Sequence, residues 1–234
     1  MTDRELREAL ERQIAYRLGG RVRSKRASVW HGAVDHVCHA YYAQHWSVFG
    51  STVYYPSTDV YDADAWASFK TLAKCYALME AQKKDPVFWV KWCFPQGLAA
   101  LALLSFMSPW WLLALAFLAP WPAPWRRNYL LQAHGVGVAI DVWTHGRHLP
   151  PAVLAARVRR VNDGYYLWPS RNTLDMVRRL NHFNDDAVSG RICRDSLAFR
   201  DVLFLLVRAG KYVPHAQSHL YNTYQRDRVV LEAR

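Results

Sequence analysis

The spacing of apolar and polar positions along the chain predicts a mainly helical protein. Residues 2–18 place leucine, isoleucine and alanine at intervals of three and four between charged residues, which predicts an amphipathic N-terminal helix. Residues 66–84 repeat this spacing and predict a central helix with one buried face, ended by Asp85-Pro86. The same pattern predicts further helices over residues 129–143, 151–161, 173–182 and 197–207.

A short β-rich segment precedes the central helix. Residues 47–61 carry β-branched and aromatic side chains around Gly50 and Pro56, which predicts one or two short strands. Asp59 and Asp62 are the expected caps of the central helix. The fold class is therefore mainly α (α+β). Its expected parts are residues 1–27, the N-terminal helix with a basic linker, residues 28–210, one helical domain, and residues 211–234, a polar tail.

An uncharged apolar segment lies between Lys91 and Arg126. Prolines divide it into two apolar pieces, 97–107 and 110–119. At about 1.5 Å per residue each piece would extend roughly 15 to 17 Å as a helix, against about 30 Å for the apolar layer of a bilayer. The pattern predicts an apolar helical hairpin over residues 97–119 that turns at Ser108-Pro109.

Two environments fit this hairpin, a membrane surface and the core of a soluble domain. Lysines and arginines flank the segment on both sides, which keeps both of its ends on the same side of a membrane. Indole rings favour membrane interfaces, and the segment is rich in them. The residues expected to meet lipid or a packing partner are Trp92, Pro109, Trp110, Trp111, Leu113, Trp121 and Trp125.

The charge balance is strongly basic, with 30 lysines and arginines against 19 aspartates and glutamates and a net charge of +11. Such a chain suits a negatively charged partner, and non-specific contact with nucleic acid is one expectation. The basic residues form no nucleic-acid-binding motif. The N-terminus is charged throughout, so no signal peptide is expected and membrane contact would come from the hairpin.

Histidines concentrate between residues 31 and 45, where a metal site is one hypothesis. The stretch begins at His31, and its candidate ligands are His36, Cys38, His39 and His45, with His145 and His148 as a later pair. Their spacing does not match the close ligand pairs of structural zinc sites. The sequence therefore predicts no metal and no cofactor.

Several short motifs occur in a recognisable order. They are Tyr54-Tyr55-Pro56, Thr71-Leu72-Ala73, Asp85-Pro86, Pro95-Gln96, the apolar hairpin, Gln132-Ala133-His134-Gly135 and residues 165–169. This order resembles phage-encoded zinc metallopeptidase-like proteins, in which a His-Glu-x-x-His helix and a later Glu-x-x-Gly helix hold the metal. The resemblance covers residues 50–207 and implies a helical zincin-like domain with the hairpin inserted.

The positions that would bind zinc in that family differ here. They are Lys74, Cys75, Leu78 and Gln132. Lysine is cationic, leucine has no donor atom, glutamine is a weak ligand, and a single cysteine does not hold catalytic zinc. The resemblance therefore implies a pseudoenzyme without metal.

From these features we expect a non-catalytic phage virion or genome-delivery protein. Its expected partners are other virion proteins in a larger assembly and membrane lipid, and its expected location is the virion or a host membrane. Two alternatives remain open at this point. One is an active metal-dependent hydrolase or peptidase with a noncanonical site, and the other is a cellular peripheral membrane protein.

Overall fold

The computed structural model describes residues 1–27, 46–56, 58–94, 98, 101–103, 107–118, 124–162, 173–193 and 196–213. Over these residues the protein is mainly helical with one small sheet, which confirms the predicted class. Its elements are α1 (Asp3–Leu18), β1 (Arg21–Ser24), η1 (Lys25–Ala27), β2 (Ser47–Phe49), β3 (Thr52–Tyr55), α3 (Thr58–Ala63), α4 (Ala65–Lys84), α5 (Phe88–Cys93), η3 (Pro109–Leu118), α6 (Pro124–His145), α7 (Pro151–Asn162), α8 (Thr173–Ser189), η4 (Arg191–Cys193) and α9 (Leu197–Arg208).

Helix α1 begins and ends at the residues that its sequence predicts. The Glu5 N–H donates to the Thr2 hydroxyl at 3.2 Å, and the Thr2 N–H donates to the Glu5 carboxylate at 2.8 Å, which together form a capping box. Gly19, with φ of 66°, ends the helix in the left-handed conformation. The apolar face of α1 is buried against α4.

Three short strands form one sheet in the order β1-β3-β2. The two short strands β2 and β3 lie within the segment that the sequence predicted as strand, and they pair antiparallel across a turn at Gly50, whereas β1 lies parallel to β3. Residues 21–24 were expected to be part of a linker. They form a strand because Val22 alternates with two arginines and because β3, distant in sequence, supplies the backbone hydrogen-bonding partners.

Helix α4 lies at the centre of the protein and begins one turn later than the expected caps. Asp64 accepts a hydrogen bond from the Ala67 N–H at 2.8 Å and caps the helix. Asp59 and Asp62 instead lie within the short helix α3, and Asp62 pairs with Arg7 at 2.9 Å. The capping prediction at those two positions was wrong because the chain forms an extra helix there.

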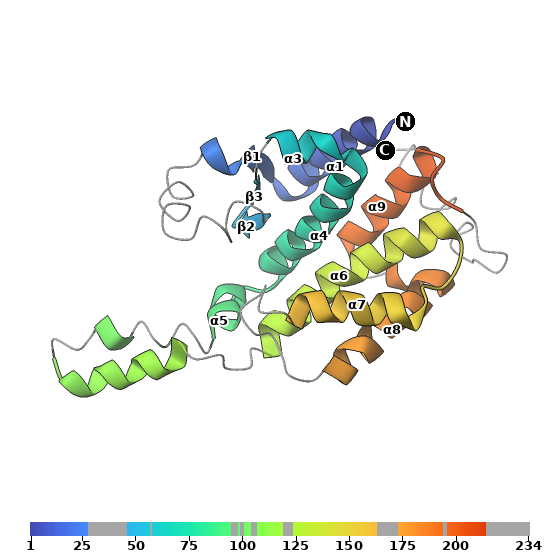
Figure 1. Cartoon of the computed structure of the whole chain (residues 1–234). Helices are drawn as coiled ribbons and strands as arrows, with labels where there is room; N and C mark the ends of the chain where they lie inside the picture. The colour runs from blue at the N-terminus through green and yellow to red at the C-terminus, as the bar shows by residue number, and fades with distance from the viewer. Residues whose placement is uncertain are drawn as a thin grey trace.

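Helices α1, α6 and α9 surround α4, and α8 packs against α6 (Figure 1). Glycines allow close contact along α6. A Cβ atom at Gly135 would lie 2.8 Å from the Phe183 ring on α8, and one at Gly137 would lie 2.8 Å from Lys74 Cε on α4. A side chain at Gly135 would displace a packed ring, whereas one at Gly137 would displace only the flexible end of a lysine.

Two helices are longer than predicted, and α5, like α3, was not predicted. Helix α6 starts at Pro124, and α8 continues to Ser189, so that Asp185 and Asp186 lie in a helix and not in a turn. Asp186 pairs with Arg191 at 2.9 Å beyond the helix end. The short helix α5 follows Asp85-Pro86 directly and connects the body to the apolar segment.

The apolar segment extends away from the helical body (Figure 1). We call its described residues, 98, 101–103 and 107–118, the apolar arm. A 3₁₀ turn at 101–103 precedes Ser108, and the 3₁₀ helix η3 starts at Pro109. Residues 107 and 108 are not helical, so no helix runs through Pro109, and proline suits the first position of the helix that follows it.

Candidate functional site

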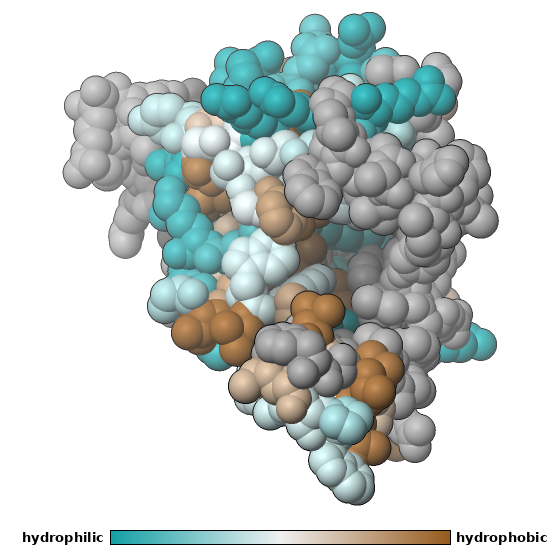
Figure 2. Space-filling model, turned by 90° about the vertical axis from the view of Figure 1, so that its left-hand side faces the viewer, coloured by the Kyte–Doolittle hydropathy of each residue, from teal (hydrophilic) through white to brown (hydrophobic). Residues whose placement is uncertain are grey.

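The apolar arm exposes large hydrophobic side chains. Leu103, Met107 and Trp110 are each more than 70% exposed, and Leu113 is 66% exposed. Figure 2 views the molecule from the side that carries the arm and shows apolar side chains gathered at its lower part, apart from the hydrophilic atoms above. A soluble monomer rarely exposes such a continuous apolar surface, so this arm is the strongest candidate for a binding element.

The geometry of η3 aligns these side chains. In a 3₁₀ helix, residues three apart lie in line, which places Trp110 and Leu113 on one outward ridge. Ala114 lies on the next ridge and is 8% exposed. The small residue is thus covered while the large residues face outward, the reverse of what a soluble helix requires.

The root of the arm is fixed to the body through Asp85. Its carboxylate accepts hydrogen bonds from Lys91 Nζ at 2.7 Å, from the Tyr129 hydroxyl at 2.5 Å and from the Val87 N–H at 3.1 Å. Hydrogen bonds from Lys91 and then Tyr129 lower the pKa of Asp85. The buried Phe88 ring packs on Tyr129, with centroids 4.5 Å apart. These contacts join α5 to α6 and hold the start of the arm in place.

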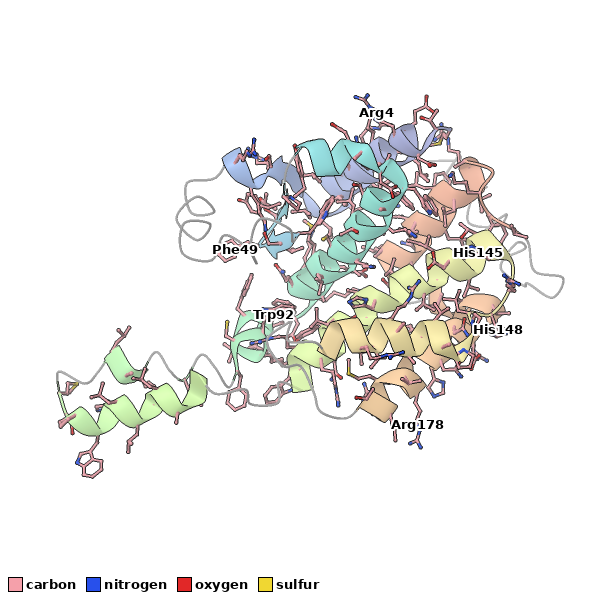
Figure 3. The ribbon with its side chains drawn as sticks, viewed as in Figure 1. Arg4, Phe49, Trp92, His145, His148 and Arg178 are labelled. Atoms are coloured by element: carbon pink, nitrogen blue, oxygen red, sulfur yellow. The ribbon has the colours of Figure 1, made fainter. Side chains whose placement is uncertain are left out.

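Exposed aromatic rings surround this root. Phe49 on β2 lies 5.2 Å from Trp89 on α5, and Phe94 lies 5.2 Å from Trp125 at the start of α6. All four side chains are at least 39% exposed. We call these four residues the aromatic collar. Figure 3 shows Phe49 and Trp92 on the side of the body from which the arm extends.

The sequence analysis identified only part of this collar. Trp125 was a predicted site residue, whereas Phe49, Trp89 and Phe94 were missed. Phe49 belongs to a strand and is forty residues from Trp89 in the sequence, so only tertiary packing brings the two rings together. Trp89 and Phe94 had one available signal, the density of aromatic residues immediately before the uncharged segment.

The tryptophans that the sequence singled out occupy two settings. Trp110 and Trp111 lie on the arm, with 77% and 40% exposure. Trp92 is partly buried at the root, where its ring stacks on Phe88 at 5.3 Å. Trp121 lies outside the residues that the structure describes.

The basic residues that flank the arm are used within the fold. Lys84 pairs with Glu80 at 2.6 Å, Arg127 with Asp175 at 3.4 Å, and Arg126 Nε donates to the Trp92 carbonyl at 2.8 Å. Lys91 pairs with Asp85 as described above. These flanking charges are therefore partly offset by partners within the fold.

No helix within the described residues is both long enough and apolar enough to cross a membrane.

The positions that correspond to the family's metal ligands lie on α4 and α6, which pack against each other. Lys74 and Leu78 are one helical turn apart, and the buried Cys75 lies beside Lys74. Burial raises the pKa of the Cys75 thiol to about 12, so the neutral thiol predominates near neutral pH. Cys75 is therefore neither a ready nucleophile nor a ready metal ligand.

Gln132 does not lie on the face of α6 that meets Lys74. Gly137 marks that face, because a Cβ there would contact Lys74. At about 100° per residue, His134 and Asp141 lie on the same side as Gly137, whereas Gln132 is about 160° from His134 around the helix. The structure thus brings His134, not Gln132, towards Lys74. The sequence analysis quoted His134 but assigned it no role.

His134 is buried and uncharged at neutral pH. Its pKa is lowered to about 3, chiefly by burial and to a smaller extent by the nearby cations Lys74 and Arg157. The later histidine pair has separate partners, since His145 Nδ1 lies 2.6 Å from the Asp141 carbonyl oxygen and His148 Nδ1 lies 3.5 Å from Asp185. Figure 3 labels both of these histidines.

Within the described part of the chain, no three histidine, cysteine, aspartate or glutamate side chains gather as a metal site would require. His31 and the earlier candidates, His36, Cys38, His39 and His45, lie outside the described residues.

Comparison with known proteins found no matching family model, curated protein or solved structure.

Proposed function

We propose that this chain is a non-catalytic phage virion or genome-delivery protein whose apolar hairpin inserts into the surface of a membrane. The observation that supports insertion is the outward ridge of Trp110 and Leu113 on an arm that extends from the body. The phage assignment rests on the resemblance described above, as does the inference that the body is a zincin-like fold without its metal.

The dimensions of the arm favour shallow insertion. The ten residues of η3 extend about 20 Å at the 2.0 Å rise of a 3₁₀ helix, less than the apolar thickness of about 30 Å. Two residues of the aromatic collar at the root, Trp89 and Trp125, carry the indole ring that favours the lipid–water boundary. The arm would therefore enter one leaflet, with the collar at the level of the headgroups.

Burial in a protein core, the alternative environment for the hairpin, is not what the described residues show, because Leu113 and its neighbours are exposed. Packing against other virion proteins in a particle uses the same apolar ridge. Lipid matches this ridge better, since an uncharged surface of leucines and tryptophans can be covered by fluid lipid without a partner of complementary shape.

Flotation with vesicles tests this proposal. The full chain, kept soluble in mild detergent that is then removed, is expected to float with phosphatidylcholine vesicles at both about 0.1 M and about 1 M NaCl. At 1 M salt the Debye length is about 3 Å, so attraction by the net charge is suppressed while apolar burial remains.

Recovery of the protein with vesicles only at low salt, or only when the vesicles are anionic, would contradict the proposal. That result would assign membrane contact to the basic surface and not to the arm.

The pseudoenzyme part of the proposal predicts that the purified protein carries no stoichiometric zinc and cleaves no protein substrate. The combined variant Lys74→His/Leu78→His is then expected to bind zinc, because it would add two histidines one turn apart opposite His134. Zinc content is measured by elemental analysis after gel filtration.

The control is the same double variant with His134→Ala added, which should bind zinc more weakly because it lacks the third ligand. About one tightly bound zinc per chain in the parent protein would instead favour an active metallohydrolase.

A further inference from the structure

A cluster of basic side chains lies where α4, α6 and α7 meet. Lys70 Nζ lies 3.7 Å from Asp141 Oδ1, and Arg157 Nη2 donates to the other oxygen of the same carboxylate. Lys74 lies one turn along α4 from Lys70. Lys70 and Arg157, from two helices, therefore pair with a single carboxylate from the third, and Lys74 adds another cation nearby.

Lys74 and Arg157 approach the same point. A Cβ at Gly137 would lie 3.8 Å from Lys74 Nζ and 3.3 Å from Arg157 Nη1. Two like charges this close repel each other unless an anion lies between them. The absence of a side chain at Gly137 leaves room for both cations beside the helix backbone.

The charges of the cluster do not balance. Asp141 offsets one of the three cations, and His134 is neutral, so a net charge of about +2 remains. Among the residues that the structure describes, Lys74 Nζ has no hydrogen-bond acceptor and no ion pair. Lys74 Nζ is not one of the fully buried atoms without a partner, so it keeps contact with solvent, and an anion that replaced this water would accept a charge-assisted hydrogen bond from it.

We propose that Lys70, Lys74 and Arg157 bind the phosphate group of a small molecule, either free phosphate or a phosphate monoester. A phosphate monoester carries a charge of about −1.5 to −2 near pH 7, which matches the excess, whereas a single carboxylate would neutralise only half of it. Arginine and lysine together supply the donors that phosphate oxygens accept.

Access to the cluster fits a ligand of this size. The Lys70 and Arg157 side chains are 30% and 20% exposed, so both are partly accessible to solvent. Partly exposed side chains of this kind suit a single oxyanion group better than the surface of a nucleic-acid duplex. The inference is independent of the arm and of its lipid partner.

The protonation of Lys74 gives the site a pH dependence. The pKa of Lys74 is lowered to about 8. Burial is the largest cause; Arg157 and Lys70 also lower this pKa, whereas Cys75 and Asp141 raise it. A bound phosphate favours the charged ammonium, so affinity is expected to fall as the pH rises through about 8. Phosphate itself stays mainly dianionic between pH 7.5 and 9, so a fall in affinity over this range reports the loss of the proton from Lys74.

The experiment is titration of the full chain, in detergent, with inorganic phosphate at constant ionic strength set by NaCl. We expect saturable binding in calorimetry at pH 7.5 and weaker binding at pH 9. Lys74→Met should weaken binding about 10- to 100-fold, as expected for loss of a hydrogen bond to a charged group.

The matched control is Lys83→Met, which removes the same charge from an exposed position on the same helix, where Lys83 Nζ lies 3.5 Å from the Arg17 carbonyl oxygen. It should leave phosphate affinity unchanged. Equal phosphate affinity in Lys74→Met and the parent protein would overturn the proposal. So would the same calorimetric signal when NaCl is added without phosphate.

A second measurement needs no variant. Reductive methylation of the parent protein, read by mass spectrometry at individual lysines, should be slowed by phosphate at Lys74 and not at Lys83. Equal protection of both lysines, or of neither, would show that phosphate does not bind at this cluster.

Discussion

Leu113→Arg is expected to weaken vesicle binding of the protein about 30- to 150-fold and to leave its thermal midpoint unchanged. A charge at the centre of an inserted helix costs about 2 to 3 kcal/mol on insertion scales, which gives this factor. Leu113 is 66% exposed on the outward ridge of η3, so its replacement removes no core contact. Surface substitutions of this kind change stability by about 0.5 kcal/mol or less.

The measurement combines vesicle flotation with a thermal melt of the same sample. Val153→Arg is the matched control, because it places the same charge at an exposed apolar position at the start of α7. Val153 lies just after the C-terminal end of α6, whereas the arm lies just before the N-terminal end of α6. The control charge is therefore not on the arm, and Val153→Arg should float like the parent protein. A cooperative loss of stability in Leu113→Arg would show that the arm packs on the body in solution.

The second large effect concerns the joining of α4 to α9. Glu80 is buried on α4, and its carboxylate accepts hydrogen bonds from the Ser196 hydroxyl at 2.7 Å and from the N–H groups of Leu197 and Ala198 at 2.9 and 3.0 Å. Ser196 is the N-cap residue of α9, but its side chain makes no capping hydrogen bond. Glu80 therefore caps α9 from another helix.

We expect Glu80→Ala to lower the free energy of unfolding by about 2 to 5 kcal/mol, because it leaves several buried donors without an acceptor. Glu80→Gln keeps one acceptor oxygen and should lose less stability. Urea denaturation measures the free energy of unfolding of both variants. Glu8→Ala is the control, since its ion pair with Arg4 is exposed and is worth about 0.3 to 0.5 kcal/mol.

The contribution of Glu80 should also depend on pH. Burial acts to raise its pKa, but the hydrogen bonds from Lys84, Ala198, Ser196 and Leu197 outweigh burial and lower it. A carboxylate with a lowered folded-state pKa stabilises the protein above its unfolded pKa of about 4.3, and this stability is lost as the pH falls through the folded value. The difference in stability between the parent and Glu80→Gln should therefore shrink in acid. A constant difference at every pH would exclude this role of the charge.

The sequence by itself determined the features that depend on neighbouring residues. Apolar spacing of three and four located α1, α4, α7 and α9, since one face of each helix must be buried. Thr2 and Gly19 marked the ends of α1 through contacts within a few residues of themselves. Pro109 divided the apolar segment because proline cannot continue a helix.

Features that depend on distant partners were decided only by the tertiary structure. Strand β1 forms because β3 lies beside it, and Glu80 caps a helix more than a hundred residues away. The aromatic collar joins Phe49 of the sheet to Trp89 of α5. Helical packing likewise determined that His134, and not Gln132, faces Lys74. Periodicity constrains which side of a helix is buried, but the partner that covers it is set by how the elements pack together.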